Sequence, residues 1–236
     1  MARLRPPAML QRRCSVLTGN RLDAATDAGS FPEREWLDEI TKPLLVDKTL
    51  DVTGGLNVSN DVTPFQKFLA QLEPREETGV SAAGLHPSSR NTAFRRQAWA
   101  DVGGYPEWLT LAAEDALFTH ELHLIGKKFF YSPQAIVHWT VRETEAAYLK
   151  LLHRNGYGGA EAGLYAPYFR RRAFIAICPL LLLLSRHRFR YFRFRWLKNY
   201  SSARGWVDGK LFGHRPPPGW QYVDNILLSP EAQRRR

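Results

Sequence analysis

The stretch Ser89–Trp139 reads SRNTAFRRQAWADVGGYPEWLTLAAEDALFTHELHLIGKKFFYSPQAIVHW and says most about the fold. It predicts a short helix over 95–102 that ends at Gly103, where a second glycine follows. A further helix is expected over 114–125, because it opens with two acidic residues and stops at Gly126.

Strands are expected after that helix, over 128–131 and 135–139, with a Ser-Pro pair between them. Upstream, helical spacing of apolar residues predicts a helix over 32–45, and a capping threonine followed by proline predicts another over 63–72. Alternation around a Gly-Gly pair predicts a bent strand over 50–58. Short helices mixed with strands are typical of an α/β domain.

The composition and charge of the chain indicate a folded protein with an anionic partner. The chain has 236 residues, 44% of them apolar and 24% charged, which indicates a folded protein. Its net charge of +10 is concentrated in 170–172, 186–195 and 234–236, so we expect an anionic surface as partner. The two cysteines, Cys14 and Cys178, lie in unlike settings and predict neither a disulfide framework nor a zinc site.

The last third differs in character from the rest, and we expect three parts: a poorly ordered basic leader over 1–20, the α/β domain over 21–165, and a membrane-proximal segment over 166–236. The apolar run 173–184 would cover roughly 18 Å as a helix, short of the roughly 30 Å hydrocarbon core. The basic and aromatic residues of 186–198 resemble an interfacial belt. A buried helix followed by a solvated basic segment is the alternative.

The motifs of the opening stretch, taken in order, resemble those of family 2 glycosyltransferases. The resemblance rests on N-T-A-F-R-R, V-G-G-Y, an E-D pair and Y-S-P-Q-A-I-V, and covers roughly 20–165. It implies an inverting transferase with a GT-A fold, a Rossmann-like α/β sheet that binds a nucleotide sugar. It also implies that Asp115 is the general base, with Glu114 beside it. An acidic turn that complements the helix dipole is the plainer interpretation of this pair.

The donor side of the resemblance is incomplete. The segment TDAGSFPEREWLDEITKPL looks like the family's D-x-D region, with Asp27 as the first aspartate and Gly29 in place of the second. The resemblance implies that Asp27 binds Mg²⁺ or Mn²⁺ on the donor diphosphate, and that Arg90 and Asn91 lie near the diphosphate. A turn aspartate is the alternative for Asp27. Relative to the family, the strands that bind the nucleoside are missing before Asp27, so we expect a truncated GT-A domain.

Other candidate site residues are less specific. His138 is a candidate metal ligand, since imidazole suits Mn²⁺, although a lone strand histidine is more often structural. Arg95, His153 and Arg154 are candidate acceptor contacts, with solvated helix surfaces as the alternative. The segment 148–159 lacks the Q-x-x-R-W motif of processive relatives, which argues against a processive synthase.

Two functions remain open on this evidence. The first is transfer of a hexosyl group to a lipid-linked or polysaccharide acceptor, at an anionic surface on the cytoplasmic face of the cell membrane. The second is a non-catalytic remnant or binding module that has lost donor binding. Arginines interleaved with aromatics can bind single-stranded nucleic acid, but no recognition motif is visible and we expect no nucleic acid partner.

Overall fold

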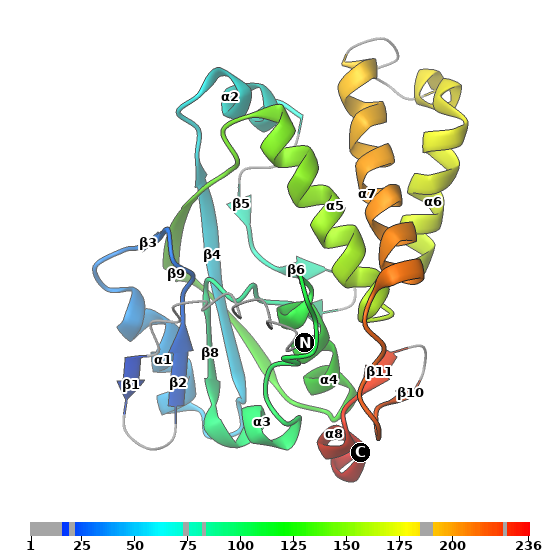
Figure 1. Cartoon of the computed structure of the whole chain (residues 1–236). Helices are drawn as coiled ribbons and strands as arrows, with labels where there is room; N and C mark the ends of the chain where they lie inside the picture. The colour runs from blue at the N-terminus through cyan, green and yellow to red at the C-terminus, as the bar shows by residue number, and fades with distance from the viewer. Residues whose placement is uncertain (1–15, 19–21, 73–75, 82–83, 185–190, 224–225) are drawn as a thin grey trace, which may run out of the picture. The chain divides into compact units, whose positions relative to one another are not determined.

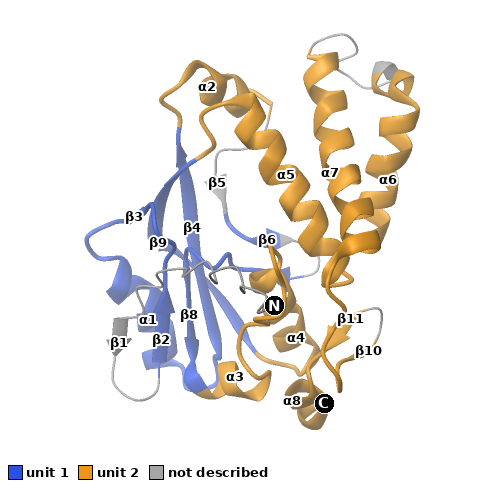
Figure 2. Ribbon diagram, viewed as in Figure 1, with its two compact units in different colours: residues 1–60, 74–96, 128–140 blue, residues 61–73, 97–127, 141–236 orange. Residues whose placement is uncertain are grey.

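A computed structural model describes residues 16–18, 22–72, 76–81, 84–184, 191–223 and 226–236. Apart from 16–18, the expected basic leader lies outside them. The chain divides into two compact units, which alternate along the sequence (Figure 2). Unit 1 contains 1–60, 74–96 and 128–140, and unit 2 contains the remaining segments, 61–73, 97–127 and 141–236. The expected division at residue 165 stays a prediction.

Unit 1 is built on a mixed sheet whose strand order is β1-β2-β8-β4-β9-β3, with β5 paired to β4. The strands are β1 (Val16–Thr18), β2 (Leu22–Ala25), β3 (Ser30–Pro32), β4 (Val52–Asn60), β5 (Glu76–Glu77), β8 (Thr92–Arg95) and β9 (Phe129–Thr140). Only β4 and β9 run parallel among the described pairs of this sheet. A separate hairpin joins β6 (Val80–Ser81) to β7 (Gly84–Leu85).

The core of unit 1 lies between this sheet and helix α1 (Trp36–Val46) (Figure 1). Ile40 and Leu44, one turn apart, are fully buried against sheet residues such as Val137. The helix expected over 32–45 therefore exists, but its predicted start was wrong. Pro32 belongs to β3 and pairs with Val137, so the helix begins only after the following turn.

The two strands expected around Pro133 are one strand, β9, with an irregularity. Its register on β4 jumps from Ser132↔Gly55 to Ile136↔Leu56, so the intervening residues of β9 have no partner on β4. Proline is tolerated there because its missing N–H takes no part in the ladder. Gly55 leaves room for this bulge, because a Cβ at that position would overlap the carbonyl oxygen of Ala135.

Unit 2 is mainly helical. It contains α2 (Pro64–Ala70), α3 (Arg96–Asp101, whose first residue falls in unit 1), α4 (Glu114–Leu124), α5 (Glu145–Glu161), α6 (Ala166–Ile177), the 3₁₀ helix η2 (Pro179–Leu184), α7 (Phe192–Phe212), β10 (Gln221–Val223), β11 (Ile226–Leu228) and α8 (Pro230–Arg235). The helices expected over 63–72, 95–102 and 114–125 are confirmed as α2, α3 and α4. Thr63 and Gln66 form a reciprocal capping box at the start of α2.

Helices α5, α7 and α6 lie side by side in unit 2 (Figure 1). The contact between α5 and α7 depends on small residues, since a Cβ at Gly205 would overlap the carbonyl oxygen of His153. A Cβ at Gly156 of α5 would likewise overlap the carbonyl oxygen of Ser202 in α7. The two backbones thus approach more closely than any larger side chain at these positions would allow.

The apolar run 173–184 is not one helix. It begins within α6, which also contains the three arginines 170–172, and it continues into the 3₁₀ helix η2. Pro179 explains the break, because proline disfavours helical backbone in the residue before it, and Cys178 has φ −113° and ψ 70°. Among the described residues, none of the helices has the length and apolar character needed to span a membrane.

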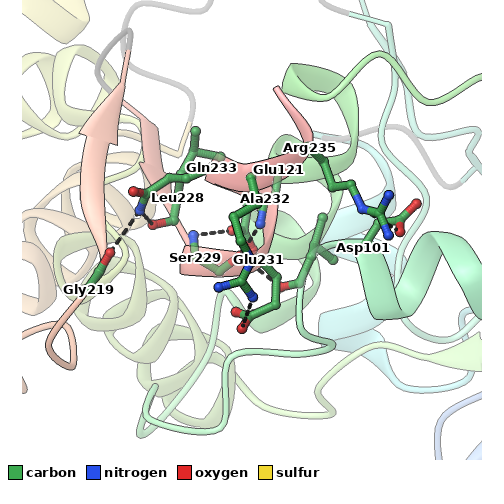
Figure 3. Close-up of polar contacts among 11 residues, drawn as sticks. Asp101, Glu121, Gly219, Leu228, Ser229, Glu231, Ala232, Gln233 and Arg235 are labelled. Atoms are coloured by element: carbon green, nitrogen blue, oxygen red, sulfur yellow. Dashed lines mark hydrogen bonds and ion pairs between the residues drawn. The ribbon is translucent and has the colours of Figure 1, made fainter.

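The C-terminal segment is anchored within unit 2 by buried polar contacts (Figure 3). The Glu121 carboxylate of α4 accepts from the backbone N–H of Ser229, whose hydroxyl caps α8 and donates to the Val102 carbonyl. Arg235 of α8 forms an ion pair with Asp101 at 3.1 Å. Burial raises the pKa of Glu121 to about 7, so this contact is sensitive to pH near neutrality.

Candidate functional site

Asp27 lies two residues after the short strand β2, beside the residues that precede β8. Because β2 pairs with β8 through Ala25↔Thr92, the segments next to these ends are brought together. The Ser89 hydroxyl donates to Asp27 Oδ1 at 3.1 Å, and Arg90 Nε lies 3.9 Å from Asp27 Oδ2. Of the residues assigned to the donor, the structure therefore brings Asp27 and Arg90 into one polar group.

The Arg90 side chain also lies over an aromatic ring from β9. Its Cζ is 4.2 Å from the ring centroid of Trp139, a distance typical of a cation–π contact. The indole Nε1 of Trp139 is buried and has no hydrogen-bond partner among the described residues. A guanidinium held between a carboxylate and an aromatic ring is suited to binding an anionic oxygen such as that of a phosphate. We call Asp27, Ser89, Arg90 and Trp139 the Arg90 cluster.

Asn91 and Arg95 have other partners in unit 1. Asn91 is fully buried, accepts from the Trp36 indole at 2.8 Å, and donates to the backbone carbonyls of Leu56 and Ala135. The Arg95 guanidinium donates to the carbonyl of Leu44 at 2.7 Å, in the last turn of α1, and to nearby carbonyls. Both side chains therefore stabilise the fold of unit 1 through their hydrogen bonds.

The residues expected to bind a divalent cation do not form a ligand set. Asp27 is already next to a cation, Arg90, and His138 Nε2 lies 3.0 Å from Glu33 Oε1. Among the described residues, no three histidine, cysteine, aspartate or glutamate side chains are grouped so that they could hold a metal ion. Mg²⁺ and Mn²⁺ prefer several oxygen ligands. The residues present thus do not fit a resident metal at Asp27.

In unit 2, Glu114 and Asp115 occupy the first turn of α4. The preceding residue, Ala113, has a left-handed backbone with φ 79°, which is uncommon for a residue with a side chain. Asp115 Oδ1 accepts from the N–H of Ala116 at 2.8 Å. A carboxylate at a helix N-terminus is favoured in its ionised form by the backbone N–H groups and the helix dipole. The position therefore favours a deprotonated carboxylate, which is the form that accepts a proton.

The loop that leads into α4 is fixed by α5. Arg154 donates to the carbonyl of Leu111 at 2.9 Å, and the buried Glu161 accepts from the hydroxyl of Thr110 at 2.8 Å. A Cβ at Gly158 would overlap the carbonyl oxygen of Ala112. Arg154, predicted from the sequence as an acceptor contact, thus binds the backbone of the loop before Glu114. Sequence reasoning missed Glu161, although an acid within the small-residue run GGAEAG was a signal of burial.

Two further residues near Asp115 were not identified from the sequence. Partial burial of its hydroxyl and then the charge of Asp115 raise the pKa of Tyr165, and the same hydroxyl lies 3.2 Å from His120 Nε2. Tyr165 also has a left-handed backbone, with φ 58°, directly before α6. His153, expected to contact the acceptor, lies 2.8 Å from Asp208 of α7. Tyr165 thus lies close to both Asp115 and His120 of α4.

Comparison with known proteins identifies the fold. No protein-family model and no curated protein sequence matches the chain. The mannosyltransferase PcManGT from Pyrobaculum calidifontis, solved with GDP-Man and Mn²⁺, is similar in structure with a TM-score of 0.52 and 16% identity. The match covers 83% of this chain and 63% of PcManGT, so the chain spans less than two thirds of that protein.

A second solved structure, GalNAc-T7 with UDP, GalNAc and Mn²⁺, matches at 15% identity over 84% of this chain and 42% of its own. Its TM-score of 0.35 is too low to support an argument about fold. The likeness to PcManGT shows a GT-A-like glycosyltransferase fold, as the sequence predicted. Membership of family 2, inversion and the role of each residue stay predictions.

Proposed function

We propose that this chain transfers a sugar from a nucleotide-sugar donor to an acceptor hydroxyl, with Asp115 as the general base. The observation that carries the proposal is the position of Asp115 at the start of α4 in a GT-A-like fold, within a sequence that holds the family 2 motifs in order. PcManGT was solved with a nucleotide sugar, which supports a donor of this class.

The reaction that these groups would perform is a single displacement. The acceptor oxygen bonds to the anomeric carbon while the bond from that carbon to the diphosphate oxygen breaks, and the configuration inverts. The acceptor proton passes to the Asp115 carboxylate, as in general base catalysis, and the nucleoside diphosphate leaves. Because the residues present do not fit a resident metal, no step of this proposal is assigned to one.

The Arg90 cluster is the proposed binding site for the donor diphosphate. Its guanidinium carries the charge that a diphosphate needs, and Trp139 holds that guanidinium in place. Arg154 is a proposed positioning residue, since it binds the backbone of the loop before Glu114. A divalent cation, if used, would come with the donor phosphates rather than occupy a site built by the protein.

The basic C-terminal third supports a proposal for the acceptor and the location. We propose a lipid-linked or polysaccharide acceptor at an anionic membrane surface on the cytoplasmic side, because arginines and aromatic residues alternate before and within α7. Flotation with anionic and neutral liposomes tests this part. Equal binding to both would contradict it.

The direct test of transfer is a screen of UDP-, GDP- and dTDP-sugars, with release of the nucleoside diphosphate as the readout. Release from at least one donor is expected. A binding module without catalysis is the second candidate, favoured by Gly29 and by the incomplete ligand set around Asp27. Calorimetry with UDP and GDP separates the two, because the proposed transferase binds one of them and a module that has lost donor binding does not.

A further inference from the structure

Helices α6 and α7 and the 3₁₀ helix η2 line a pocket in unit 2, and this pocket is strongly positively charged. Its volume is about 260 Å³, and four of its eight lining residues are cations, Arg171, Arg172, Arg195 and Lys198. The remaining lining residues, none of them acidic, are Tyr168, Ile175, Leu182 and Asn199. A single pocket that gathers four positive charges without a carboxylate in its lining is electrostatically matched to an anion.

Two of these cations are partly removed from water. The Arg172 Cζ lies 4.4 Å from the ring centroid of Tyr168, and its Nε is buried with no hydrogen-bond partner among the described residues. Its Nη1 reaches the Lys198 carbonyl and the Ser202 hydroxyl only at 3.5 Å and 3.4 Å. Burial lowers the pKa of Lys198 to about 8. Both groups carry a cost of burial that a bound anion would reduce.

The segment that lines one side of the pocket also exposes large apolar side chains. The same segment that supplies Ile175 and Leu182 exposes Phe174, Ile177 and Leu180, which are 59%, 79% and 72% accessible. Large apolar side chains exposed within one short segment are suited to contact with another apolar group. A ligand that joins one phosphate to a hydrocarbon chain would satisfy both features.

We propose that the pocket between α6 and α7 binds a phosphate group, with its four cations, Arg171, Arg172, Arg195 and Lys198, as the contacts. The apolar neighbours favour the phosphate of a lipid over free phosphate. A volume of about 260 Å³ lies just below the roughly 300–1,000 Å³ of drug-sized ligand sites, so the pocket holds a head group and leaves the chain outside. The proposal concerns binding by unit 2 and does not depend on sugar transfer.

The test is calorimetry of the full chain with decyl phosphate below its micelle concentration and, separately, with inorganic phosphate. The pocket variant is Arg171→Gln with Lys198→Gln. The matched control is Arg170→Gln with Arg204→Gln, which removes the same charge from exposed positions on the same two helices outside the pocket lining. We expect decyl phosphate to bind, at least tenfold weaker binding in the pocket variant, and less than a twofold change in the control.

The two arms identify the source of the phosphate. Tighter binding of decyl phosphate than of inorganic phosphate supports a lipid head group, and equal affinities support free phosphate at the same site. No binding of either compound, or equal losses in the pocket and control variants, overturns the proposal. The proposal is also overturned if a single-stranded oligonucleotide displaces decyl phosphate equally from the wild type, the pocket variant and the control. If the pocket variant unfolds more readily by circular dichroism, Arg171→Gln with Arg195→Gln replaces it.

Discussion

The Arg90 guanidinium lies over the indole ring of Trp139, with 4.2 Å between Cζ and the ring centroid. The two residues come from different parts of the chain, one before β8 and the other near the end of β9. Trp139 and Asp27 together hold the Arg90 guanidinium in one orientation. Holding a long side chain in this way costs conformational entropy, which a function for its charge would explain.

Arg90→Gln is therefore expected to weaken binding of UDP or GDP about tenfold, which corresponds to about 1.4 kcal/mol. Calorimetry measures the effect. Arg96→Gln is the control, since Arg96 forms an exposed ion pair with Asp23 at 2.9 Å. If wild type and Arg90→Gln bind UDP or GDP with equal affinity, the diphosphate does not bind at the Arg90 cluster.

Mn²⁺ alone is expected not to bind the protein at micromolar concentration, because the described residues offer no group of three ligands. Electron paramagnetic resonance distinguishes free aqueous Mn²⁺ from the bound ion. We expect the free signal to persist with protein and to fall only when nucleoside diphosphate is added. Stoichiometric binding without nucleotide contradicts this.

Glu121 should make stability depend on pH. Its pKa is raised from 4.5 to about 7 in the folded protein, so the folded state holds the proton more tightly. The free energy of unfolding therefore falls as pH rises from about 5 to 8, by about 3 kcal/mol at 1.36 kcal/mol per pKa unit. Glu121→Gln keeps an oxygen acceptor for Ser229 and should flatten this part of the curve.

Urea denaturation at several pH values measures the difference between the two proteins. At pH 8 the variant should be more stable than wild type, and at pH 5 the difference should be small. Glu107→Gln, at an exposed position, should leave the slope unchanged. A Glu121→Gln curve parallel to that of wild type would contradict a raised pKa.

Gly205→Ala tests the close approach of α5 and α7. Alanine favours a helix over glycine by about 1 kcal/mol, yet its Cβ would overlap the backbone of His153. We expect a net loss of about 1–3 kcal/mol in stability, typical of overpacking. Val207→Ala, at an exposed position on α7, should change stability by less than about 0.5 kcal/mol. A stabilised Gly205→Ala protein would mean that the helices can separate.

Local signals were sufficient for several elements. The capping box of α2 involves residues only three positions apart, and α4 has acidic residues in its first turn and a glycine after its end. The positions of both helices could therefore be predicted from neighbouring residues. The GT-A-like fold was also predicted, through the ordered motifs rather than through any single one. Such features do not depend on distant parts of the chain.

Long-range partners explain most of what could not be predicted. Asn91 was predicted to lie near the donor diphosphate. Its buried amide joins Trp36 to Ala135, and nothing near it in the sequence shows this. Pro133 looked like a strand boundary, but it falls in a bulge that Gly55 of another strand makes possible. The burial of Glu161 likewise depends on contacts with Thr110.

Asp115 is the proposed base of the glycosyl transfer. The most direct measurement is the initial rate of nucleoside diphosphate release from the best donor of the screen, compared between wild type, Asp115→Asn and the exposed control Glu107→Gln. Thermal unfolding confirms that all three are folded. Loss of a general base typically costs 10²–10⁴ in rate, so we expect at least a hundredfold decrease for Asp115→Asn and none for Glu107→Gln. Release at the wild-type rate by a folded Asp115→Asn protein would contradict a role for Asp115 as the base.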